Sequence, residues 1–244
     1  MALAACANEG PEITVAAAAD LQFAFEEIGR AFEQTCGCKV VLTLGSSGKF
    51  AAQIKEGLPA DVFASANITY IDELDRQGLI LSDTKQVYAI GRIVLAVPTS
   101  SALEIRDLRD LLSPGIRKIA IANPDHAPYG VAAREALETS GLWDAIHPKL
   151  VLGENAAQTT QFVETGDAQA GIVPLSLAVQ RKDRLRYVLI DESLHTPLRQ
   201  AAAVLVRSRQ PDLARAFIEF INGAEGRPIM RKYGFVLPGE EPIR

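Results

Sequence analysis

The chain has 244 residues, of which 48 % are hydrophobic and 23 % are charged, enough for one large core or two medium ones. Its formal net charge is −5 and it has no block of basic residues, which argues against a nucleic-acid-binding protein, because that function needs clustered Lys and Arg. It contains no run of about eighteen apolar residues, so no segment is predicted to span a membrane.

The N-terminal residues predict export. Residues 1–8 read MALAACAN and resemble the end of a secretory signal that lacks its charged and apolar regions. Residues 3–6, LAAC, also resemble a lipobox, in which Cys6 would become a lipidated first residue. The alternative is a disordered Ala-rich leader, so residues 1–10 are assigned as a leader or a signal remnant.

Short apolar strands and amphipathic helices alternate in the first third of the chain. The helix predicted at residues 21–32 has apolar residues at helical spacing, including Leu21, Phe25 and Ile28. Repeated strand–helix units predict a mostly parallel sheet with helices on both faces. The predicted strands are 13–17, 39–44 and 61–64, and the further helices are 49–56 and 68–77.

A longer apolar strand is predicted at residues 88–97 and ends at Pro98, after which the alternation restarts. Between Pro98 and residue 200, the predicted helices are 105–112, 131–140, 157–165 and one beginning at 176–179, and the predicted strands are 118–122, 150–152, 170–173 and 187–190. An apolar segment at 200–206 follows, and after it come two amphipathic helices, 211–222 and 225–233.

This order predicts an α/β protein of two lobes with mixed, mostly parallel sheets. Residues 11–88 and 201–244 would form the first lobe, and residues 89–200 would be inserted as the second. Ligands of open parallel sheets bind at the carboxyl ends of the strands, so a ligand cleft is expected between the lobes.

Cys36 and Cys38 flank Gly37 just before a predicted strand. Two cysteines do not make a metal site, and a spacing of two residues disfavours a relaxed disulfide. In an exported protein the two could still pair with each other, or one of them with Cys6. We assign them no chemistry.

Four short polar segments each precede a predicted helix, two in each lobe. A helix start leaves backbone N–H groups without intrahelical partners and carries a partial positive charge. Four such starts could converge on one anion without any Lys or Arg, which would suit a protein that binds a small oxyanion. The segments are residues 18–20, 46–48, 128–130 and 154–156.

Within these segments we single out residues that could donate hydrogen bonds. Ser47 offers a hydroxyl and an N–H, Tyr129 an N–H and a phenol, and Ala156 an N–H directly after the natural N-cap Asn155. Each also has a purely structural interpretation, as a plain helix cap or a packed aromatic. Asp20 is an ideal N-cap, and a dianion would repel its carboxylate unless the ligand keeps a proton, so we expect capping.

No residue pattern indicates catalysis. The three histidines, His126, His147 and His195, are scattered, and the sequence has no dinucleotide-binding loop, Walker motif or metal-spaced Cys/His set. The chain is therefore predicted not to be an enzyme and to need no cofactor. An enzyme on the same fold stays a more distant alternative, with Asp20 and His126 as its only candidate bases.

A series of short motifs runs from Ile13 to about Val236. They are ITVAAAADL at 13–21, GSSG at 45–48 with QI at 53–54, GLPADVFASA at 57–66, NPDHAPYG at 123–130, GLWD at 141–144, GIVP at 171–174 and KYGF at 232–235. In their order and spacing the chain resembles the periplasmic molybdate-binding proteins of ABC importers. The resemblance implies a two-lobed type II binding-protein fold, molybdate or tungstate as ligand, a membrane permease as partner, a monomer and a periplasmic location, free or lipid-anchored through Cys6.

Carried over by position, the resemblance implies ligand donors at Asp20, Ser47, Tyr129 and Ala156. The chain departs from the family at Asp20, where Ser or Thr is common, and at Pro174, where the family often has a Tyr hydroxyl. Ser176 or the Tyr129 phenol could replace one lost donor. These departures leave open a different oxyanion, including a protonated one that Asp20 could accept a hydrogen bond from.

Overall fold

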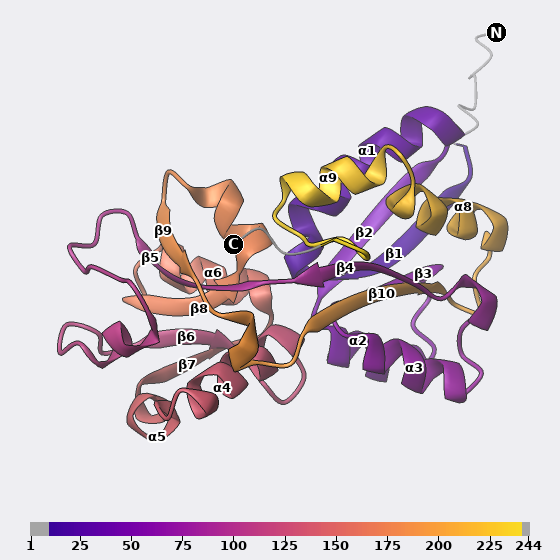
Figure 1. Ribbon diagram of the computed structural model, residues 1–244. Helices are drawn as coiled ribbons and strands as arrows, with labels where there is room; N and C mark the ends of the chain where they lie inside the picture. Colours follow the sequence, from indigo (N-terminus) through magenta and orange to yellow (C-terminus); the bar gives the residue numbers. More distant parts are fainter. Residues whose placement is uncertain (1–9, 241–244) are drawn as a thin grey trace, which may run out of the picture.

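The structure is a computed structural model that describes residues 10–240. Nearly all of the predicted leader, including Cys6, lies outside these residues. The described chain forms two five-stranded sheets side by side, each covered by helices (Figure 1). We call each sheet with its helices a lobe, and the predicted α/β fold of two lobes is confirmed.

The first sheet has the strand order β2-β1-β3-β10-β4. Strand β1 pairs in parallel with β2 and β3, whereas β10 runs antiparallel to both β3 and β4. The sheet is therefore mixed, with antiparallel pairs wherever β10 takes part. Its strands are β1 (Glu12–Ala18), β2 (Lys39–Gly45), β3 (Val62–Ser65), β4 (Gln86–Gly91) and β10 (Leu198–Val204).

The second sheet repeats this arrangement with the order β7-β6-β8-β5-β9. Strand β6 is parallel to β7 and β8, and β5 is antiparallel to β8 and β9. Each sheet thus has two parallel and two antiparallel pairs, fewer parallel ones than predicted, and every antiparallel pair includes β10 or β5. The strands are β5 (Ile93–Pro98), β6 (Ile119–Ala122), β7 (Leu150–Gly153), β8 (Ala170–Pro174) and β9 (Leu185–Leu189).

The prediction of a single strand at residues 88–97 was wrong. The segment is two strands, β4 in the first sheet and β5 in the second, which meet at Arg92. The apolar pattern continues through the break because both strands are largely buried. The chain returns to the first sheet between Leu189 and Leu198, and the proposed lobe boundaries at residues 88 and 200 stay a prediction.

Helices cover both faces of each sheet. In the first lobe α1, α8 and α9 lie over one face, and α2 and α3 lie over the other (Figure 1). In the second lobe α4 and α6 pack against β6 and β8 from opposite faces. The helices are α1 (Gln22–Cys36), α2 (Ser47–Lys55), α3 (Ile68–Arg76), α4 (Pro128–Thr139), α5 (Trp143–Ile146), α6 (Ala156–Glu164), α7 (Leu175–Ala178), α8 (Pro211–Asn222) and α9 (Gly226–Lys232).

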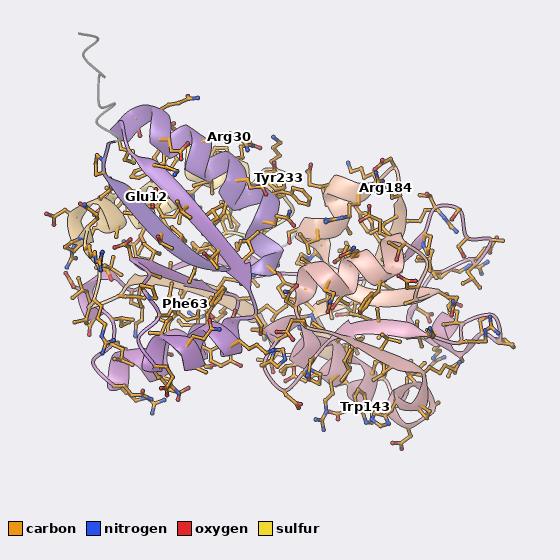
Figure 2. All side chains as sticks on the ribbon, turned by 180° about the vertical axis from the view of Figure 1, so that it is seen from behind. Glu12, Arg30, Phe63, Trp143, Arg184 and Tyr233 are labelled. Carbon is orange, nitrogen blue, oxygen red and sulfur yellow. A yellow bond between two sulfur atoms is a disulfide. The ribbon has the colours of Figure 1, made fainter. Side chains whose placement is uncertain are left out.

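Aromatic rings fill the core of the first lobe. Phe217 of α8 packs edge-on against Phe25 and Phe32 of α1, with ring centroids 6.0 and 5.3 Å apart. On the other face of the sheet, Phe63, labelled in Figure 2, packs edge-on against Phe50 of α2 at 6.5 Å. These contacts bury large apolar surfaces and fix α1 and α2, the helices that follow β1 and β2.

Two local features differ from expectation. The predicted helix at 105–112 is only a short 3₁₀ helix, η3 (Leu108–Leu112), whose first turn is capped by Asp107. Cys36 and Cys38, whose pairing the spacing disfavoured, are joined by a disulfide around the end of α1, where Gly37 adopts a left-handed conformation.

Within residues 10–240, the structure contains no helix long and apolar enough to cross a membrane.

Candidate functional site

A small pocket lies between the two lobes. The first lobe contributes three segments to its wall and the second lobe contributes two. None of the lining residues is Lys or Arg. They are Ala18, Ala19, Asp20, Gly45, Ser46, Ser47, Ala66, Ala127, Pro128, Tyr129 and Ala156.

The pocket is built where strands are followed by helices. Strand β1 leads into the 3₁₀ turn η1 (Ala19–Leu21), and β2 leads directly into α2. In the second lobe β6 and β7 lead into α4 and α6. The N-termini of α2, α4 and α6 therefore all border one pocket, as predicted for an anion site.

Four of the five residues that we singled out line this pocket. They are Asp20, Ser47, Tyr129 and Ala156. The fifth, Ser176, lies behind Asp20, where its buried hydroxyl donates to the Asp20 carbonyl oxygen at 2.8 Å. A direct contact of any of the five with a ligand stays a prediction.

The prediction that the Asp20 side chain caps a helix was wrong. Neither η1 nor α1 has a side-chain cap, because Asp20 lies inside the 3₁₀ turn rather than before it. Its Oδ2 accepts hydrogen bonds from the Tyr129 phenol at 2.9 Å and from Gln200 Nε2 at 2.7 Å. Its Oδ1 is buried and has no hydrogen-bond partner in another residue.

Burial shifts the titration of Asp20 towards its neutral form. The residue is 1 % exposed. Burial raises the pKa of its carboxyl from the ordinary 3.8 to about 6, although hydrogen bonds from Gln200, Tyr129 and its own backbone N–H lower it.

Gln200 is the functional candidate that sequence reasoning missed. This fully buried residue of β10 also places Nε2 3.1 Å from the Tyr129 hydroxyl, and its Oε1 lies 3.1 Å from the hydroxyl of Tyr88 on β4. Burial, and secondly the charge of Asp20, raise the pKa of both phenols well above its ordinary value of 10. A lone Gln in an apolar strand was the available signal, because a buried amide requires polar partners.

The Ser47 side chain is free of a capping role. Ser47 is the first residue of α2 and Ser46 is its N-cap, and no side chain caps this helix. The Ser47 Oγ accepts the Ala66 N–H at 3.0 Å, so its own hydroxyl hydrogen can be directed into the pocket. This arrangement fits the hydrogen-bonding interpretation of Ser47 better than the capping one.

The two lobes are joined around the pocket. The His126 carbonyl oxygen accepts the Gly48 N–H at 3.0 Å and the Ser46 hydroxyl at 2.6 Å. Because the Ser46 hydrogen is used there, His126 Nδ1, 2.9 Å away, is the donor to Ser46 Oγ. An ion pair between Lys49 and Glu154 also crosses between the lobes. His126, expected as a solvated loop residue, is half-buried and holds the lobes together.

Known proteins are similar to this chain over nearly its whole length. A family model for bacterial extracellular solute-binding proteins matches residues 13–236. The molybdate-binding protein ModA of Azotobacter vinelandii is 33 % identical over 238 residues, covering 96 % of this chain and 94 % of the relative. The corresponding protein of Rhodobacter capsulatus is 32 % identical, covering 97 % and 92 %.

A solved structure agrees. The Azotobacter vinelandii periplasmic molybdate-binding protein superposes with a TM-score of 0.88 at 30 % identity, covering 93 % of this chain and 99 % of that one. The sulfate-binding protein SubI of Mycobacterium tuberculosis, at 20 % identity and a TM-score of 0.79, shares the fold. The resemblance recognised in the sequence is confirmed, and the chain belongs to the bacterial extracellular solute-binding proteins.

Proposed function

We propose that this chain is the solute-binding subunit of an ABC importer and captures a tetrahedral oxyanion, molybdate or tungstate. Relatives that match nearly the whole chain are named molybdate-binding proteins. The pocket offers what such an anion needs, which is convergent hydrogen-bond donors around a small space between two lobes.

The observation that carries this proposal is the charge of the pocket wall. Three helix N-termini and the Ser47 hydroxyl surround the pocket, and its lining contains no Lys or Arg. Neutral donors neutralise an anion by hydrogen bonding and helix dipoles rather than by ion pairing. Such a wall suits a small oxyanion.

The joined lobes support a capture-and-delivery role. With His126 bonded to Ser46 and Gly48, both lobes present fixed surfaces on either side of the pocket. We propose that a membrane permease recognises this closed form of a monomeric, periplasmic protein, free or lipid-anchored through Cys6, and that the chain catalyses no reaction. Asp20 and His126, the candidate bases, are each held by hydrogen bonds to pocket-wall residues.

A second candidate ligand is an oxyanion that keeps a proton, such as hydrogen phosphate or hydrogen arsenate. The specific observation in its favour is the buried Asp20 carboxyl, which could accept that proton in a charge-assisted hydrogen bond.

One calorimetric series tests both candidates. The purified protein, freed of bound anions by partial unfolding and dialysis, is titrated with molybdate, tungstate, sulfate, chromate, phosphate and arsenate in an organic buffer. We expect one-to-one binding of molybdate and tungstate, and a higher melting temperature at saturation, since a ligand at about 1,000 times its Kd adds roughly 4 kcal/mol. Binding of phosphate or arsenate alone would instead establish the second candidate.

A further inference from the structure

Asp20 is a buried carboxyl with two unlike oxygens in the wall of an anion pocket. Oδ2 accepts two hydrogen bonds, from Tyr129 and Gln200, whereas Oδ1 has no partner in another residue. Two donors already occupy Oδ2, so a proton bound by this carboxyl belongs on Oδ1.

No cation faces Asp20 from the described elements packed around it. Tyr129 of α4, Gln200 of β10 and Ser176 of α7 reach it directly, and Tyr88 of β4 lies behind Gln200. The phenols are neutral, since burial raises their pKa well above the ordinary value. An ionised Asp20 therefore has hydrogen bonds but no counter-charge in this shell.

The charged groups near the pocket lie further out and have their own partners. His126 contacts Ser46, and Lys49 pairs with Glu154 across the lobes. Arg181 of the 3₁₀ turn η5 (Val179–Arg181) pairs with Glu164 and lies over the ring of Phe23. None of them offsets two like charges, a carboxylate and a dianion, confined in one small buried space.

Resting on the function proposed above, we propose that Asp20 binds the oxyanion as a neutral carboxylic acid that donates its Oδ1 hydrogen to it. The proton comes from solvent whenever the free protein holds Asp20 ionised. Capture of a dianion is then coupled to uptake of one proton, and the residue that would repel the ligand becomes one of its donors.

The coupling has a definite sign. The carboxyl of the free protein, with a pKa of about 6, is ionised at pH 8 and largely protonated at pH 5. Binding at pH 8 must therefore add about one proton, and the association constant falls about tenfold for each pH unit above the pKa. Below that pKa no proton is needed, and the affinity becomes independent of pH.

Asp20→Asn is the matched variant, because an amide accepts the Tyr129 and Gln200 hydrogen bonds and donates to the anion without titrating. Asp144→Asn is the control, since it removes one exposed carboxyl from α5, beside Trp143 at the outer part of the second lobe (Figure 2).

The experiment is calorimetric titration with sodium molybdate at pH 5 and pH 8, each in three buffers of different ionisation enthalpy. The dependence of the measured enthalpy on the buffer gives the protons taken up. We expect about one proton more for the wild type and Asp144→Asn than for Asp20→Asn at pH 8, and no difference at pH 5. We also expect Asp20→Asn to bind more tightly than the wild type at pH 8.

The other outcomes separate the two proposals. Molybdate binding with equal proton uptake in wild type and Asp20→Asn at pH 8 overturns the coupling and leaves the ligand assignment intact. Should Asp20→Asn fail to fold, the wild type decides alone, because uptake that does not fall between pH 8 and pH 5 overturns the coupling. No molybdate or tungstate binding at either pH overturns both proposals. Tight phosphate binding at pH 8 without proton uptake assigns Asp20 as an ionised acceptor.

Discussion

Single residues decide the polarity of this site, and Ser47 and Asp20 contribute in opposite ways. Ser47 adds a neutral donor whose oxygen is already anchored by the Ala66 N–H. Asp20 adds a carboxyl whose charge is disfavoured by burial. Each of the two leads to a prediction that concerns one side chain only.

Replacing Ser47 with Ala removes one hydroxyl donor from the pocket. An oxyanion oxygen left without that partner loses roughly 1.5–3 kcal/mol, so the affinity for molybdate should fall about 10- to 150-fold in calorimetry. Stability should also fall by about 1–3 kcal/mol, because the Ala66 N–H loses its acceptor. Ser193→Ala, which removes an exposed hydroxyl, is the control. An unchanged molybdate affinity would leave Ser47 only its bond to Ala66.

Asp20 also makes the stability of the ligand-free protein depend on pH. Its folded pKa, about 6, lies above the ordinary 3.8, so its contribution is fully present below pH 3.8 and is lost as the pH rises through 6. Asp20→Asn lacks this loss. The free energy of unfolding of the variant, relative to wild type, should therefore rise by about 2–3 kcal/mol between pH 4 and pH 7.5.

Urea unfolding of both proteins at several pH values measures that difference. The subtraction is essential because Glu27, Glu73 and Glu240 have pKa values lowered mainly by hydrogen bonds to Lys232, Lys55 and Arg231, and change stability in the opposite sense. A difference between the proteins that does not vary with pH would mean that Asp20 titrates normally.

At the scale of elements, the start of α2 is the part of the site with the least room. A Cβ added at Gly48 would lie 2.6 Å from the His126 carbonyl oxygen and 2.8 Å from the Tyr70 hydroxyl. The helix and the second lobe therefore approach more closely than any residue other than Gly allows.

The variant Gly48→Ala distinguishes the effect of helix propensity on stability from the effect of lobe approach on ligand affinity. Helix propensity alone predicts up to about 1 kcal/mol of stabilisation from this change. We expect instead a lower molybdate affinity, because the lobes cannot approach around His126, together with a larger radius of gyration in small-angle scattering with ligand. Gly29→Ala is the control, because an alanine there makes only ordinary contacts with Val40 of β2. Gly166 would not serve, since its positive φ of 81° would strain an alanine. Equal affinities for Gly48→Ala and wild type would contradict this account.

Elements whose ends are marked by Pro or by a capping residue were predictable from the sequence. Pro128 and Asn155 mark helix starts, so the strand–helix junctions of the pocket could be found without coordinates. The break at Arg92 could not, since apolar residues continue on both sides of it. The role of Gln200 was also hidden, because its partner Asp20 lies 180 residues earlier in the chain.

At the scale of the whole molecule, two lobes share one chain that crosses between them twice. The alternation of strands and helices was sufficient to predict two sheets and a pocket between them, because that order is a property of the sequence. The closeness of the lobes was not predictable. It depends on hydrogen bonds such as that from Ser46 to His126, 80 residues apart. Nothing in the sequence around either residue indicates that the two are in contact.

The strand order also determines which sheet can be completed first during synthesis. Every strand of the second sheet lies between Ile93 and Leu189, so that sheet is complete on one continuous stretch. In the first sheet β10 lies between β3 and β4 and is made more than 100 residues after β4, so that sheet is completed only after the second one. Gln200 arrives on that strand, and the amide that holds the Asp20 carboxyl is therefore among the last groups to take its place in the maturing protein.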